Sequence, residues 1–144
     1  MSNELANWTN EPVMPDFVGS LMDESASFCS FEANTEDEKL KLYDIMNAPD
    51  KRIGDCINEV IKVKDVFCEV VQCKREDGSG IDYCPRIVLV DVDGISYQSV
   101  SMGIYTSIKN LIKALGAPTW EKGVPLKVIQ VTRGTNKMLS LKRA

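Results

Sequence analysis

The sequence predicts an all-β protein that contains one helix, and three observations lead to this class. β-Branched residues dominate an unusually long run from 57 to 75, as is typical of strands. Asp93–Gly94 is a strong hairpin signal, because glycine tolerates a positive φ. Apolar residues recur at helical spacing between Ser101 and Gly116. The chain has 144 residues, of which 44% are hydrophobic, and this is enough for one core.

Residues 1–38 differ in charge from the rest of the chain. They hold nine acidic residues and no Lys or Arg, whereas residues 39–144 hold all 17 Lys and Arg against 12 acids. The two segments carry −9 and +5, which sum to the net charge of −4. Polar residues predict weak order for residues 1–38, yet Trp8, Phe17 and Phe28 are too apolar for a purely solvating tail. We therefore expect an arm that docks onto its own domain, another subunit or a partner.

The domain is expected to span residues 39–144 and to begin with a short extra strand. Leu40 and Leu42 alternate with Lys41 and Tyr43, which predicts this strand. The run from 57 to 75 follows as one long strand. Its alternation of apolar and polar residues slips near Asp65, and such a slip predicts a bulge.

Two further strands are expected around the hairpin turn. Residues 83–92 form the first, and residues 95–100 return as the second. If the Asp93–Gly94 turn has two residues, Tyr97 pairs with Val90 across the hairpin.

A helix follows, and then two last strands. Ser101 is a suitable N-cap, Gly116 a suitable C-terminal stop, and Pro118 prevents continuation. The sequence "VPLKVIQV" predicts a strand, "TRGTNK" a turn, and "MLSLK" the final strand. The apolar positions of the helix are Ile104, Ile108, Leu111, Ile112 and Leu115.

From residue 57 the order is long strand, strand, strand, helix, strand, strand. This is the element order of the OB-fold, a five-stranded Greek-key barrel that binds oligonucleotides on the face of its second and third strands. The first and last hairpin loops flank that face. In this chain they correspond to residues 75–82 and 132–137.

The order and spacing of four motifs resemble a known family. They are "VVQCKRED" at the end of the long strand, "DGISYQSVS", a helix with "LIKAL", and "LKVIQVTRGTNKMLSLK". From about Leu42 to Leu141, about two-thirds of the chain, the sequence resembles the single-stranded DNA-binding proteins of phi-29-type phages, which replicate linear genomes from a protein primer. The resemblance implies an OB-fold that coats single strands during replication and uses exposed tyrosines. It also implies action in the host cytoplasm.

The resemblance also points to individual residues. Tyr97 matches the family tyrosine after the "DG" turn, Cys73 occupies the position of an aromatic at the end of the long strand, and Tyr83 corresponds to a loop tyrosine. Stacking on such rings is sequence-tolerant because every base has a π-face, and cations add phosphate contacts. The candidate cations are Lys62, Lys64, Lys74, Arg75, Arg86, Lys127, Arg133, Lys137, Lys142 and Arg143.

Each aromatic candidate also has a structural interpretation. Tyr97 and Tyr83 either stack on bases or pack in the core, and the same holds for Tyr43. Trp120 follows Pro118 after the helix, which favours packing over the end of the barrel. Tyr105 lies beside the apolar stripe of the helix, so we expect it to be structural.

Several functions are disfavoured by composition. The chain has no histidine, which excludes His-based catalytic triads and His-ligated zinc. Its five cysteines include no C-x-x-C pair and no spacing typical of disulfides, so they are expected to be reduced and buried. Asp91 and Asp93 are the best candidates for a divalent metal, but no third ligand is evident. We therefore expect no cofactor and no metal.

Membrane segments are not expected either. No apolar run approaches the roughly 20 residues that a membrane-spanning helix needs, and no signal-peptide pattern opens the chain.

The sequence thus predicts a non-enzymatic protein that binds single-stranded DNA without sequence preference. The alternative is an OB-like module that binds protein or RNA. The expected partners are single-stranded DNA, further copies of the chain through the N-terminal arm, and other replication proteins.

Overall fold

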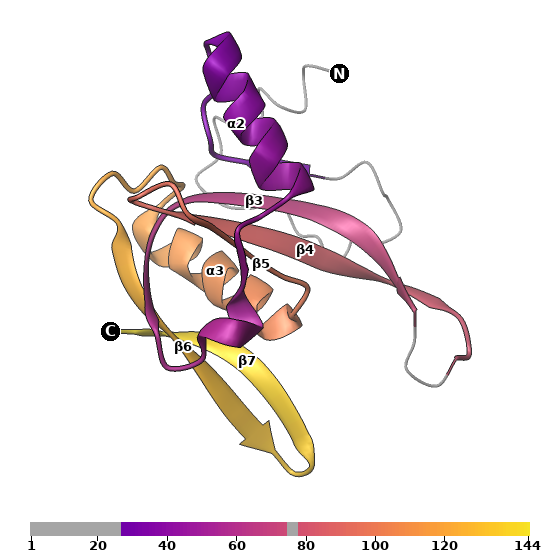
Figure 1. Cartoon of the computed structure of the whole chain (residues 1–144). Coiled ribbons are helices and arrows are strands. Elements are labelled where there is room, and N and C mark those ends of the chain that lie inside the picture. Colours follow the sequence, from indigo (N-terminus) through magenta and orange to yellow (C-terminus); the bar gives the residue numbers. More distant parts are fainter. Residues whose placement is uncertain (1–26, 75–77) are drawn as a thin grey trace.

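The computed structural model describes residues 27–74 and 78–144 (Figure 1). These residues form a seven-stranded, curled sheet in the order β2-β5-β4-β3-β6-β7, with β1 paired to β3 outside this path. Their order from β3 onward confirms the OB-like class, although they contain two α-helices where one was expected. The elements are β1 (Ser27–Cys29), α2 (Glu36–Asn47), β2 (Lys51–Arg52), the 3-10 helix η1 (Ile53–Cys56), β3 (Val60–Lys74), β4 (Ile81–Asp91), β5 (Ser96–Ser99), α3 (Met102–Leu115), β6 (Val124–Arg133) and β7 (Asn136–Arg143).

Strand β3 is the long bulged strand that the sequence predicts. Its register against β4 shifts between Val63 and Asp65. Before the shift, Ile61 and Val63 point into the core, and after it Val66 and Cys68 do so. The bulge therefore changes which alternate residues face inward.

Helix α3 matches its predicted bounds and packs across the barrel. The hydroxyl of Ser101 accepts hydrogen bonds from the backbone amides of Gly103 and Ile104 at 3.2 and 3.4 Å. A Cβ atom at Gly103 would overlap the carbonyl oxygen of Leu139 on β7, so only glycine permits this close approach. The fully buried residues of the helix are Ile104, Tyr105, Ile108 and Ile112.

The two aromatics assigned to packing are structural. Tyr105 is fully buried, and Trp120 packs against the core while its indole N–H donates to the carbonyl of Gly116 at 3.2 Å.

The hairpin between β4 and β5 differs by one residue from the predicted register. Its loop has three residues, because Asp91 N–H donates to the carbonyl of Ile95 at 2.9 Å and Gly94 N–H donates to that of Asp91 at 3.0 Å. Gly94 has a φ of 85°, as this loop type requires. Tyr97 therefore pairs with Leu89 rather than with Val90.

The prediction of a short strand beginning at Lys39 is wrong, because these residues belong to α2. Thr35 and Glu38 form a capping box: the Glu38 amide donates to Thr35 Oγ1 at 3.1 Å, and the Thr35 amide donates to Glu38 Oε1 at 3.1 Å. The backbone amides of Asn34 and then Thr35 hold the pKa of Glu38 below its usual value. This cap outweighs the weak alternation of Leu40 and Leu42.

The last part of the acidic segment packs against its own domain. β1 pairs with the middle of β3, where Phe28 lies opposite Cys68, and Phe28 is buried in the core. The pairing of β6 with β3 ends at Val63, and β1 pairs with the same edge of β3 further along the strand. β1 thus covers an edge that would otherwise be unpaired. A second apolar cluster lies on the outer side of the sheet, where Ile45 of α2 covers Phe67, Val88 and Val90, with Cys29 and Phe31 packed against them.

One expectation about the cysteines is wrong. Cys73 and Cys84 form a disulfide between β3 and β4, because the strand register brings these distant positions together. Cys56 and Cys68 are buried free thiols, as expected, and burial raises the pKa of both.

Candidate nucleic-acid interface

Three lysines lie on the outer face of strands β3, β6 and β7. Lys127 stands between Val60 on β3 and Lys142 on β7 in the strand register. Its neighbours Leu126 and Val128 point inward and are buried, so its own side chain points outward. Lys62 lies on the same outer face, two residues along β3 from Val60. We call Lys62, Lys127 and Lys142 the lysine strip.

The strip contains a like-charge pair. Lys127 and Lys142 are directly opposite on antiparallel strands, an arrangement that is destabilising when both residues carry the same charge. A bound anion would relieve this repulsion, since it would supply the missing opposite charge between the two ammonium groups.

The other candidate cations do not join the strip. Lys137 pairs with Thr132 near the tip of the β6–β7 hairpin, on the opposite face from Lys127. Arg133 ends β6 beside that tip and Arg143 ends β7. Lys64 lines a separate cleft described below. Lys74 is the last residue of β3, and Arg75 lies outside the described residues.

Arg86 is engaged within the protein. Its guanidinium Nη1 lies 2.9 Å from Glu69 Oε2, and its Nε donates to Gln98 Oε1 at 3.4 Å. The three residues lie on the outer face of β3, β4 and β5, which is the face that OB-folds use for oligonucleotides. The salt bridge reduces the charge that Arg86 can offer to a phosphate.

Part of that face is covered by the protein's own chain. Phe67, Val88 and Val90 are buried beneath Ile45 of α2 and the neighbouring Phe31. In this conformation, bases cannot stack on these three apolar residues.

Tyr97 does not offer an exposed ring. It is 7% exposed and belongs to the core, so the packing interpretation describes it and a base cannot stack on it in this conformation. Its hydroxyl donates to Asp91 Oδ2 at 3.0 Å. Burial first, and then this hydrogen bond, raises the pKa of Tyr97 to about 12. The ammonium of Lys51, which sequence reasoning missed, lies 5.8 Å from the ring centroid.

The other two tyrosines are more accessible. Tyr43 is 56% exposed on α2. Tyr83 is half-buried on β4, opposite Gln72, and packs against the edge of the core. The positions of these rings are compatible with stacking, which stays a prediction for both.

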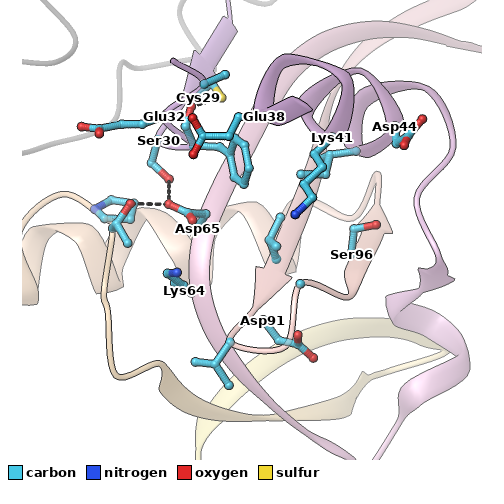
Figure 2. A pocket seen from close by; sticks show the side chains of 18 of the residues that line it. Cys29, Ser30, Glu32, Glu38, Lys41, Asp44, Lys64, Asp65, Asp91 and Ser96 are labelled. Atoms are coloured by element: carbon cyan, nitrogen blue, oxygen red, sulfur yellow. Dashed lines mark hydrogen bonds between the residues drawn. The ribbon is translucent and has the colours of Figure 1, made fainter. Parts of the chain in front are cut away.

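A cleft of about 1650 Å³ lies between α2, the segment before it, the β4–β5 turn and residues 117–121 (Figure 2). Eight of its lining residues are acidic, and Lys41 and Lys64 are the two lysines among them. Asp65 accepts hydrogen bonds from the hydroxyls of Ser30 and Thr119. The cleft is therefore an acidic surface, and it repels phosphates.

Asp91, one of the two carboxylates considered for a metal, is engaged within the protein. Asp91 Oδ1 accepts the backbone amides of Asp93 and Ile95 at 2.9 Å, and Oδ2 accepts the Tyr97 hydroxyl. Within the described residues no group of three or more acidic or cysteine side chains is arranged for a metal. Neither described helix has the length and apolar character needed to cross a membrane.

The curled sheet and its outward-facing lysines define a class, that of small OB-like nucleic-acid-binding proteins. The family profile described as phage single-stranded DNA-binding protein, of the phi29 type, matches residues 22–143. The chain belongs to this family, which binds single-stranded DNA and is not a class of enzymes. Comparisons with curated proteins and with solved structures give no match.

Proposed function

We propose that the protein coats single-stranded DNA without sequence preference during phage DNA replication in the host cell. The observation that carries this proposal beyond the family assignment is the opposed pair Lys127 and Lys142. The fold tolerates their repulsion, and a sugar–phosphate backbone running across β6 and β7 would neutralise it. Such contacts carry no sequence information, as a coating protein requires.

Stacking supplies the second part of the proposal. Tyr83 is the favoured platform, because it projects from β4 on the inner side of the long β3–β4 hairpin and is half exposed. Tyr43 is the more exposed ring, but α2 carries four acids against two lysines, which disfavours phosphates nearby. Arg86 and the hairpin cations Lys74, Arg75, Arg133 and Lys137 remain secondary candidates for phosphate contact.

The N-terminal arm is a candidate for contacts that join copies of the chain or bind other replication proteins. Phe28 is buried against the chain's own sheet, which removes it from contact with another subunit, whereas Phe31 packs only partly against that sheet. Trp8, Phe17 and Leu21 lie outside the described residues and stay candidates for contact with another copy or another replication protein. Light scattering on the full chain and on a chain lacking residues 1–26 tests this, since loss of the contact lowers the assembly mass.

A titration tests the main proposal and separates it from the alternative of an RNA- or protein-binding module. Labelled oligo-dT, duplex DNA of equal length and a structured RNA are titrated at several salt concentrations. We expect oligo-dT to bind best and its affinity to fall steeply with salt, because phosphate neutralisation releases counterions. Equal affinity for duplex and single strand would contradict the proposal, and a preference for the structured RNA would favour the alternative.

A further inference from the structure

The tip of the β6–β7 hairpin carries cations that the lysine strip does not use. Residues 133–138 include Arg133 and Lys137 and no acidic residue. Lys137 is exposed, and the next residue, Met138, is an exposed large apolar side chain at 41%. Figure 1 shows this hairpin projecting from the end of the molecule opposite α2.

The acidic cleft has the opposite properties and lies at the other end. Its eight carboxylates against two lysines give it a formal charge of −6. Asp65 and Asp91 are buried, and the hydrogen bonds that they accept come from hydroxyls and backbone amides. Figure 2 shows further carboxylates, those of Glu32 and Asp44, around the same space.

The size and lining of the cleft fit a polypeptide segment. Its volume of about 1650 Å³ exceeds the roughly 300–1,000 Å³ of small-molecule sites. Ile45, Phe31 and Val92 add apolar surface to the lining, and Val92 is 38% exposed. A basic segment with one flexible apolar side chain would therefore match both the charge and the apolar surface.

We propose that the cleft receives the tip of the β6–β7 hairpin from a second copy of this chain. Lys137 would face the cleft carboxylates, and Met138 would contact the apolar lining. Because the two surfaces are different and lie at opposite ends of the molecule, the contact is heterologous. Repetition of such a contact gives an open row of copies rather than a closed dimer.

This inference rests on the proposed function, and it adds a mechanism for coating. A row of copies whose lysine strips follow one strand would bind long DNA cooperatively, because each bound copy offers a site to the next. The negative cleft would at the same time keep the strand out of the protein–protein contact.

Charge reversal tests the contact from both sides. The variants are Lys137→Glu at the hairpin tip, Asp93→Lys at the cleft, and the two together on one chain. Asp93 is exposed and its backbone amide keeps its bond to Asp91 in the variant. The control is Lys113→Glu, which makes the same charge change at an exposed position of α3.

Mass photometry on long poly-dT at sub-saturating protein measures how strongly copies cluster. We expect each single reversal to lower the cooperativity about tenfold or more, since like charges then meet in the contact. The combined variant should recover clustering, because the pair is restored with its signs exchanged. The Lys113→Glu control should cluster like the unmodified protein.

Three results would overturn the inference. The first is unchanged clustering in both single variants, and the second is a combined variant that clusters no better than the singles. The third is normal clustering of Lys137→Glu together with loss of binding of a synthetic lysine-rich peptide by Asp93→Lys, which would show that the occupant is a different protein.

Affinity for an oligo-dT that holds one copy separates this inference from the proposed function. Unmodified protein that fails to bind this oligonucleotide contradicts the proposed function, whatever the variants do. The contact is then measured without DNA, by sedimentation equilibrium at low salt, where the same pattern of loss and recovery is expected.

Discussion

The phenolic hydroxyl of Tyr97 donates a hydrogen bond of 3.0 Å to Oδ2 of Asp91, and both residues are 7% exposed. The other carboxylate oxygen of Asp91 holds the amides of the β4–β5 turn. One buried carboxylate thus connects the turn to the ring on the strand that follows it. The tyrosine that looked like a surface platform is a structural element of the hairpin.

Substitution of Tyr97 should affect stability more than binding. Tyr97→Phe keeps the ring but leaves a buried oxygen of Asp91 without its partner, which should cost about 1–3 kcal/mol of unfolding free energy. Tyr97→Ala also removes a core ring and should cost about 3–5 kcal/mol. Urea unfolding measures both, and oligo-dT titration of the folded protein should show unchanged affinity. A Tyr97→Ala protein of normal stability and weakened binding would restore the platform hypothesis.

Stability should fall at high pH because Tyr97 keeps its proton in the fold. The folded protein raises the pKa of Tyr97 to about 12, whereas an unfolded tyrosine titrates near pH 10. The contribution of the neutral ring is therefore complete below about pH 10 and is lost as the pH rises toward 12. We expect a loss of about 2–3 kcal/mol over this window.

The Tyr97→Phe variant is the control for this pH dependence. The buried thiols of Cys56 and Cys68 also have raised pKa values and contribute in the same direction. The difference in unfolding free energy between the unmodified protein and Tyr97→Phe, followed with pH, therefore gives the contribution of the Tyr97 hydroxyl alone. Identical pH profiles of urea stability would show that the tyrosine does not contribute.

Removal of the lysine strip should change the salt dependence of binding. Replacing Lys62, Lys127 and Lys142 by serine should reduce the slope of log affinity against log salt by about 2, since each single-strand phosphate contact contributes about 0.7. The protein should also become slightly more stable, because the like-charge pair is gone.

The matched control replaces three exposed lysines elsewhere, Lys39, Lys41 and Lys113. It removes the same charge, so a general electrostatic effect would lower both slopes equally. Equal slopes in the two triple variants would place the DNA path elsewhere.

Tyr83 should contribute a stacking ring. We expect Tyr83→Ala to weaken oligo-dT binding by about 1–3 kcal/mol and Tyr83→Phe to have little effect, because the ring and not the hydroxyl stacks. Tyr43→Ala should weaken binding less. Melting temperatures accompany the titrations, since Tyr83 also packs against the core. If only Tyr43→Ala weakens binding, Tyr43 and not Tyr83 is the ring on which bases stack.

Much of the barrel could be predicted from local signals. The alternation slip at Asp65, the cap at Ser101 and the stop at Gly116 each correspond to a feature of the structure. The helix α2 was missed although its signal was present. Thr35 followed by Glu38 is a capping box, but the strand alternation of Leu40 and Leu42 was given more weight.

The site was harder to predict, because it depends on register. A three-residue loop in place of a two-residue turn moves Tyr97 from Val90 to Leu89, and a shift of one residue exchanges the faces of a strand. The opposition of Lys127 and Lys142 and the pairing of Arg86 with Glu69 likewise depend on the register of the β6–β7 and β3–β4 hairpins. A change of one residue in either register would separate these pairs.

The bulge in β3 also determines how the chain can change in length. Odd-numbered residues face inward up to Val63, and even-numbered residues do so from Val66 onward. Deletion of Lys64 would remove the extra residue of the bulge, so the two halves of the strand could no longer both keep their present orientation. If the first half kept its orientation, the second half would turn over. Glu69 would then point into the barrel and Cys68 toward solvent. A loop between strands can gain or lose a residue at small cost, whereas this strand can do so only together with a new bulge.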